Sequence, residues 1–318
     1  MTLLLTKTEL RNKSKIKEKL AEYLPSFRKI ADHYSEDEVF HLVLSAISVN
    51  EYDAVHVEKY RSREKYHLNY KKIEDWIKEK LVPNTILIGP NDSDLLKLVI
   101  FSLAMPYKML KGGTRATMTE KTRRTKQRDF EQIFSDTFIG KIGEIAFKKF
   151  LNQKFGRDLK LDWDISTDIH TFKSDLPDSK CVVSIKSTDT LESIWAEAPK
   201  NADYGIFVKV ALPKDFFIKI LAHISSLKKF LNFVEEHLEK DDQTGRDLLS
   251  FVEKTAYQDG IAIKAYIYGF FKTSDNTLKK KGEEIPFLGE VHEDKHLVEC
   301  NKLKCSLEGW KQFFEQVL

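Results

Sequence analysis

The segment from Gly140 to Lys186 constrains the fold more strongly than any other part of the chain. It begins with GKIGEIAFKKFL, whose apolar residues recur at helical spacing around Glu144. A strand is predicted next over 159–172, then a polar turn, then a second strand over 180–187. The segment therefore indicates a helix packed beside a β-hairpin.

The second strand of this hairpin ends in Ser184-Ile185-Lys186. A period of two places the side chains of Ser184 and Lys186 on one face of the strand. A lysine on a mostly buried strand is costly unless an anionic group lies beside it. Asp168, on the preceding strand, can supply that group if the two strands pair antiparallel.

Further elements follow the hairpin. A strand is predicted over 203–212, a helical region over 215–240 after Pro213, and a last strand over 260–271. Together with a helix over 138–155, the pattern predicts a mixed α/β fold of the α+β type.

These residues resemble a known pattern. An acid on one strand, an [Asp/Glu/Ser]-x-Lys triplet on the next and a Gly-x-x-Gly-Glu helix before them are similar to the PD-(D/E)xK, or restriction-endonuclease-like, nuclease superfamily. The resemblance covers residues 137–272, and the order of elements agrees with the αβββαβ core of that family. It implies a Mg²⁺-dependent nuclease.

The resemblance also implies roles for the site residues. Asp168 would be the principal Mg²⁺ ligand, with Ser184 giving a side-chain oxygen and Ile185 a backbone carbonyl. Lys186 would hold or polarise the attacking water and offset negative charge in the transition state. Mg²⁺ prefers oxygen ligands, and it lowers the pKa of bound water.

A hydroxyl is a weaker Mg²⁺ ligand than a carboxylate. Because Ser184 stands where the family usually has a second acid, we expect another acidic residue to supply the missing carboxylate ligand. Glu144 is the first candidate. Glu197 and Glu192, on a short helix predicted over 191–199, are the alternatives. Two further acids, Asp162 and Asp164, compete with Asp168 for the place on the first strand.

A basic segment lies just before this core. We expect it to contact phosphate groups of DNA, because its cations would release counterions from a duplex. The alternative is a solvated connector. The candidate DNA-binding residues are Lys111, Arg115, Lys121, Arg123 and Arg124.

The remainder of the chain divides by composition. A helical N-terminal region is predicted over 1–106, with one of its helices over 60–81. The basic connecting segment spans 107–136, the core 137–272, and a C-terminal subdomain 273–318.

Composition excludes some classes of protein. No apolar run approaches the ~20 residues of a membrane span, and three cysteines argue against a disulfide framework. A bacterial-type cytoplasmic protein is expected. The sequence has no Walker loop and no Gly-x-Gly-x-x-Gly fingerprint, so no nucleotide cofactor is expected.

One other cluster contains metal-ligand residue types. Its members are His292, His296, Cys300 and Cys305, but no Cys-x-x-Cys knuckle is present. Packed cysteines and solvated histidines are the favoured interpretation, and a zinc site is the alternative.

The leading hypothesis from the sequence is a type II restriction endonuclease that cuts double-stranded DNA as a homodimer, because symmetric sites call for symmetric dimers. The alternatives are another DNA nuclease of the same fold, acting in repair or phage defence, and a non-catalytic DNA-binding relative.

Overall fold

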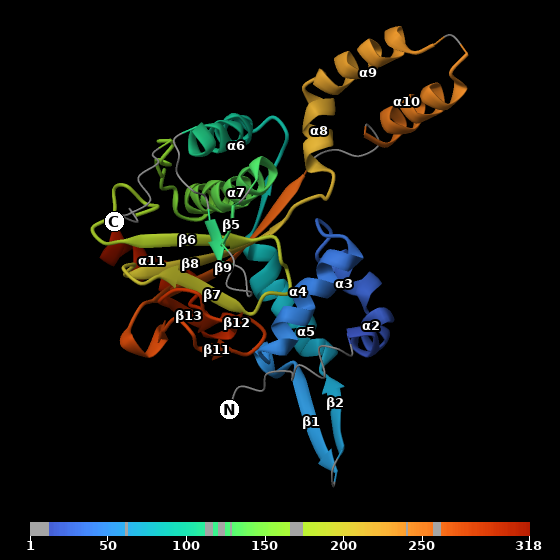
Figure 1. Ribbon diagram of the computed structural model, residues 1–318. Coiled ribbons are helices and arrows are strands. Elements are labelled where there is room, and N and C mark those ends of the chain that lie inside the picture. The colour runs from blue at the N-terminus through green and yellow to red at the C-terminus, as the bar shows by residue number, and fades with distance from the viewer. Residues whose placement is uncertain are drawn as a thin grey trace.

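A four-stranded sheet lies at the centre of the computed structural model, between a helical layer on one face and a mixed layer on the other (Figure 1). The structure describes residues 13–60, 63–111, 117–119, 125–127, 129–165, 174–239, 241–256 and 262–318. At 13–16, 57–60, 63–66, 111, 117–119 and 125–127 it describes the backbone alone. The fold is a mixed α+β arrangement, as the sequence predicts at the level of class.

The central sheet has the strand order β3-β9-β8-β6. Its strands are β3 (Thr85–Ile88), β9 (Ile263–Lys272), β8 (Tyr204–Ala211) and β6 (Val183–Thr188). β9 pairs antiparallel with both β3 and β8, whereas β6 pairs parallel with β8. β6 is therefore an edge strand, and one side of its backbone is open to other partners.

The strand β8 is buried along its whole length and faces two separate cores. Ile206 and Val208 point into the core beneath the helical layer. Phe207 and Ala211 point into the core on the opposite face. Alternation between two apolar layers explains why this strand has almost no polar residue.

The helical layer consists of α6 (Ser93–Lys111), α7 (Phe130–Phe155) and α11 (Leu307–Val317). Asp129 and Gln132 cap the start of α7 reciprocally, and Gly156 ends it in the left-handed conformation at φ 63°. Lys148 Nζ lies 2.9 Å from Asp94 Oδ2 and ties α7 to α6. This ion pair therefore links the two long helices of the layer.

The opposite layer combines N-terminal helices with a second sheet, which has the order β10-β13-β7. The elements are α3 (Leu24–Ile30), α4 (Glu36–Ser48), α5 (Tyr70–Trp76), β7 (Trp195–Pro199), β10 (Leu278–Lys279) and β13 (Lys295–Glu299). Ser35 and Glu38 form a capping box at the start of α4, where the acidic run of the sequence suits a helix N-terminus.

Smaller elements complete the described chain. They are α2 (Lys13–Ala21), β1 (Val55–Tyr60), β2 (Arg63–Leu68), β4 (Thr117–Thr119), β5 (Thr125–Gln127), α8 (Phe216–His223), α9 (Ser226–His237), α10 (Gln243–Ala256), β11 (Glu284–Ile285) and β12 (Gly289–Glu290), with one π-turn at Ile77–Leu81 and 3₁₀ turns at Glu51–Asp53, Val82–Asn84, Asp275–Thr277 and Cys300–Lys302. Among the described residues, none of the helices combines the length and the apolar character that a membrane crossing requires.

Of the helices predicted from the sequence, one is wrong in its first part and another is wrong throughout. The first part of 60–81 belongs to the antiparallel pair β1-β2, and a helix begins only at Tyr70. The short helix predicted over 191–199 is wrong because Trp195–Pro199 is β7, whose residues alternate between buried and half-buried positions as they pair with β13. Tertiary pairing outweighs the local helical pattern in both segments.

The predicted strand over 159–172 is also wrong in its described part, since 159–165 has no regular secondary structure. Residues 166–173 lie outside the described chain. β3, which comes from the predicted helical N-terminal region, completes the central sheet, so the region over 1–106 shares its core with the rest of the molecule.

Candidate active site

A cleft of about 600 Å³ lies at the free edge of β6, where α7 crosses it. Its lining comes from α7, from the segment before β6, from β6 itself and from β7. The charged residues that line it are Asp136, Glu144, Asp175, Lys186, Asp189 and Glu197. The cleft is thus strongly acidic and has a lysine at its wall.

Close packing of α7 on β6 brings Glu144 into the cleft. A Cβ atom on Gly143 would lie 2.6 Å from the Cβ of Ser187, so only glycine permits this approach. Ser187 Oγ donates hydrogen bonds to the carbonyl oxygens of Ile139, at 2.6 Å, and Gly140, at 3.2 Å. These bonds hold the helix against the strand, with Glu144 next to the contact.

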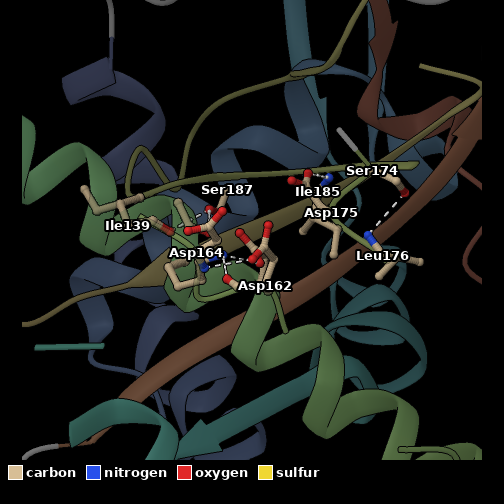
Figure 2. Close-up of polar contacts among 11 residues, drawn as sticks. Ile139, Asp162, Asp164, Ser174, Asp175, Leu176, Ile185 and Ser187 are labelled. Carbon is tan, nitrogen blue, oxygen red and sulfur yellow. Dashed lines mark hydrogen bonds and ion pairs between the residues drawn. The ribbon is translucent and has the colours of Figure 1, made fainter. Parts of the chain in front are cut away.

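The segment Ser174–Leu176 occupies the open edge of β6 (Figure 2). Asp175 N donates to Val183 O at 2.9 Å, and Ser174 Oγ accepts from Val183 N at 3.1 Å. Ile185 N then donates to Asp175 Oδ2 at 2.6 Å. The open edge of β6 therefore positions the carboxylate of Asp175.

The same edge also presents a backbone carbonyl. The N–H and C=O groups of one strand residue point to the same side of the strand. Because Ile185 N points to Asp175, the carbonyl oxygen of Ile185 lies along the same edge. Ile185 itself is among the residues that line the cleft.

Burial dominates the electrostatics of Glu144, whose exposed fraction is 8%. Burial raises the pKa of Glu144 from its ordinary 4.5 to about 8, and the charges of Asp175 and Asp162 act in the same direction. Lys141 Nζ, 2.7 Å from Glu144 Oε2, lowers the pKa and only partly offsets this. Lys141 also donates to the carbonyl oxygen of Asp162 at 2.7 Å, which keeps the ammonium group in place.

The pKa of Asp175 is also raised. Burial raises its pKa to about 6, against the opposing effects of the Ile185 N–H and the charges of Lys186 and Lys141. Two carboxyl groups with raised pKa values in one cleft are a common mark of a site that binds a cation or moves protons.

The donor atoms in this cleft suit Mg²⁺. Glu144 and Asp175 supply carboxylate oxygens, and Ile185 supplies a carbonyl oxygen, all of them hard ligands. A divalent cation would also relieve the repulsion between the two carboxylates. Across the described ranges no set of three His, Cys, Asp or Glu side chains is placed to hold a metal ion together. Proteins nevertheless usually bind Mg²⁺ through one or two carboxylates, and water molecules and substrate phosphate complete the coordination shell.

The structure brings three of the residues singled out from the sequence together: Glu144, Ile185 and Lys186 all line the cleft. Ser184 lies elsewhere: it is completely buried, is not among the cleft residues, and its Oγ has no hydrogen-bond partner among the described residues. Asp168 falls outside the described residues, so its role as a ligand remains a prediction.

Asp175 is the site residue that the sequence interpretation missed. It falls in the segment read as a polar turn between two strands. One signal was available: Leu176, directly after it, is completely buried, and an apolar residue in a polar turn indicates that the segment packs against the core.

The alternative acids have other surroundings. Glu197 lines the cleft from β7, and its Oε2 lies 2.7 Å from Lys295 Nζ. Glu192 Oε2 lies 3.0 Å from His41 Nδ1. Asp162 and Asp164 are both exposed, and Asp164 N donates to Asp162 Oδ1 at 2.8 Å. Glu197 is therefore the one alternative that also reaches the cleft.

The basic segment is described only in part. Two short strands within it, β4 and β5, pair antiparallel. Lys111 is the last residue of α6, and its side chain is not described. The other candidate DNA-binding residues, Arg115, Lys121, Arg123 and Arg124, lie outside the described chain, so the arm remains a prediction.

The surroundings of the histidine and cysteine cluster do not favour zinc. His296 is buried rather than solvated: its Nδ1 lies 2.9 Å from Thr277 Oγ1, and its Nε2 lies 3.2 Å from Lys200 O. Both ring nitrogens are therefore engaged by protein atoms. All three cysteines are free, and Cys300 is buried in the core, as the favoured interpretation expects.

A second cleft continues from the first. It has a volume of about 550 Å³ and shares Lys186, Ser187, Thr188 and Glu197 with the acidic cleft. Its further lining includes the aromatic rings of Trp195 and Phe207. A polymeric substrate could therefore extend past Lys186 toward the half-buried ring of Trp195, whereas Phe207 is buried in the core.

Comparison with known proteins finds no relative. No family model matches the chain, and neither a curated protein nor a solved structure is similar to it.

Proposed function

We propose that the chain is a Mg²⁺-dependent endonuclease that hydrolyses phosphodiester bonds of double-stranded DNA, built on a restriction-endonuclease-like core. The observation that carries this proposal is the meeting of Glu144, Asp175 and Lys186 at the open edge of β6. Two carboxylates can hold the metal ion that assists phosphodiester hydrolysis, and a lysine beside them can offset the negative charge of the transition state.

Glu144, Asp175 and the carbonyl of Ile185 would hold the metal ion. Bound there, Mg²⁺ would supply Lewis acidity toward the phosphate and lower the pKa of a coordinated water. Asp175 replaces Asp168 as the principal carboxylate ligand in this proposal, because its position is set by the backbone of β6. Glu144 supplies the second carboxylate ligand, which Ser184 cannot provide.

The two lysines have different tasks. Lys186 lies at the wall that both clefts share, where its ammonium group orients the attacking water and offsets charge on the transition state. Lys141 binds Glu144 and keeps the carboxylate turned into the cleft. Lys141 is thus a positioning residue, and Lys186 is the catalytic residue.

The finer proposal is a sequence-specific type II restriction enzyme that acts in the bacterial cytoplasm. Its support is the large part of the chain outside the acidic cleft, which could read bases, together with the basic segment before α7. A nuclease of repair or phage defence is the nearest alternative.

The test is incubation of purified protein with supercoiled plasmid and Mg²⁺. Discrete linear fragments support a restriction enzyme, whereas nicking or a smear supports a less specific nuclease of the same core. Retention of DNA without cleavage, over a range of divalent metals, would contradict the catalytic proposal and favour a non-catalytic DNA-binding relative.

A further inference from the structure

The helical hairpin formed by α9 and α10 projects from the body of the molecule beyond α8 (Figure 1). Leu227, Leu231 and Ala256 form a small core with Ala222 of α8. Four other large apolar side chains of the hairpin stay in solvent: Phe230 is 61% exposed, Phe233 60%, Leu248 61% and Phe251 68%. Single exposed apolar residues are ordinary, but four on one small element mark an interaction surface.

These four side chains lie on one face of the hairpin. Phe230 and Phe233 are three residues apart on α9, and Leu248 and Phe251 are three apart on α10. At 3.6 residues per turn, each pair is rotated by roughly 100° in the same sense from the residues that face the other helix. Because α9 and α10 run antiparallel, equal rotations bring both pairs to the same side. We call this surface, formed by the four residues, the apolar face.

Charged residues border the apolar face in an ordered way. On α9, exposed Lys229 and Glu236 lie seven residues apart on one flank; on α10, exposed Asp247 and Lys254 do the same on the other flank. Since the helices are antiparallel, both lysines lie at the end near α8 and both acids lie at the tip. The borders of the apolar face thus carry lysines at the end near α8, called the base, and acids at the far end, called the tip.

We propose that the apolar face binds the same face of a second copy of this chain, with the two hairpins antiparallel. A two-fold axis across the helices then packs α9 on α9 and α10 on α10 as a four-helix bundle. Lys229 meets Glu236 of the partner subunit, and Asp247 meets Lys254 of the partner subunit. The opposite orientation would place base against base and bring like charges together.

The arrangement also suits the shape and size of the element. Placing the α8 end of each hairpin beside the far end of the partner's hairpin puts the two bodies at opposite ends of the bundle. The four exposed side chains offer on the order of 400 Å² per copy. This is about half of the ~800 Å² that a standard interface buries on each side, and the flanking polar residues would add to it.

The first experiment measures mass in solution by light scattering and sedimentation. The wild-type chain is expected to be a dimer, and F233S/F251S is expected to raise the dimer dissociation constant at least tenfold without loss of helical circular dichroism. Ile100→Ser, at a 70% exposed position on α6, is the matched control and should leave the dimer intact. A monomeric wild type, or a dimer that F233S/F251S does not weaken, overturns the proposal.

Charge reversal tests the orientation. Each double variant alone is expected to dimerise at least tenfold more weakly than the wild type. In K229E/K254E an acid meets an acid at every pair, and in E236K/D247K a lysine meets a lysine. An equimolar mixture of the two variants restores every pair and should form a mixed dimer. If the mixture stays monomeric while the wild type dimerises, the antiparallel arrangement is wrong. Sedimentation of a monomeric wild type with anionic phospholipid vesicles would assign the face to a membrane surface instead.

Discussion

The amide of Ile185 donates its hydrogen to Oδ2 of Asp175 over 2.6 Å. This bond joins an acid of an irregular segment to an edge strand, and it does so one residue before Lys186. The carboxylate is therefore positioned by the backbone of β6. Since the same edge presents the Ile185 carbonyl, β6 supplies that carbonyl and Lys186, and its backbone positions the carboxylate of Asp175.

Asp175→Asn is expected to lower DNA cleavage by at least about 10³-fold, because the neutral amide cannot hold a divalent cation in the same way. The amide oxygen can still accept from Ile185 N, so the melting temperature should change little. Plasmid cleavage rates and thermal unfolding measure the two effects. Asp178→Asn, at an exposed position three residues later, is the control. Equal rates in Asp175→Asn and the wild type would remove Asp175 from the site.

Lys186→Ala should abolish cleavage but leave DNA binding measurable, because the cleft keeps its carboxylates while the cation beside the reacting phosphate is gone. Filter retention at low salt and plasmid cleavage separate binding from catalysis. Lys180→Ala, an exposed lysine just before the same strand, serves as the matched variant and should cut normally. Persistent cleavage by Lys186→Ala would refute the proposed role.

Gly143→Ala should destabilise the fold by about 1–3 kcal/mol, because the new methyl group would lie 2.6 Å from Ser187 Cβ and Oγ. The control is Gly140→Ala, since no atom lies within 4 Å of a Cβ there. That change should leave stability unchanged or raise it by up to about 1 kcal/mol through helix propensity. Urea unfolding of both variants measures the difference. Similar losses in the two variants would show that the helix and strand do not meet at Gly143.

The metal-free protein should lose stability as pH rises from about 5 to 8. Burial raises the pKa of Glu144 to about 8, above its ordinary 4.5, so between these values the folded protein keeps a proton that the unfolded chain has released. Stability is then fully present at low pH and falls as the pH approaches 8. Asp175, with its pKa raised to about 6, adds to the fall below pH 6.

Glu144→Gln removes this titration, so its unfolding free energy should depend less on pH over the same range. Urea unfolding in the presence of a chelator, at pH 5 and pH 8, provides the comparison. Mg²⁺ should stabilise the wild type more at pH 8 than at pH 5, since the ion competes with protons for the carboxylates. Parallel pH curves for the two proteins would contradict the buried position of Glu144.

Local pattern predicted those parts of the molecule in which one short segment contains the whole signal. The part of α7 around Glu144 and the β6 strand that contains Lys186 show a helical and a strand period in the sequence, and β8 shows a continuous apolar run. Within α7, Gly143 permits the close approach that Ser187 makes. The order of the predicted helices and strands indicated the α+β class.

Only the tertiary structure decided what lies along the open edge of β6. Asp175 approaches Ile185 through a segment with no periodicity, and a hydrogen bond between residues ten apart leaves no trace in a local pattern. The same holds for Trp195–Pro199, which becomes a strand because β13, nearly a hundred residues later, pairs with it. Spacing along one helix or strand is a property of the chain, whereas the partner of a strand edge is chosen by the packing of the whole molecule.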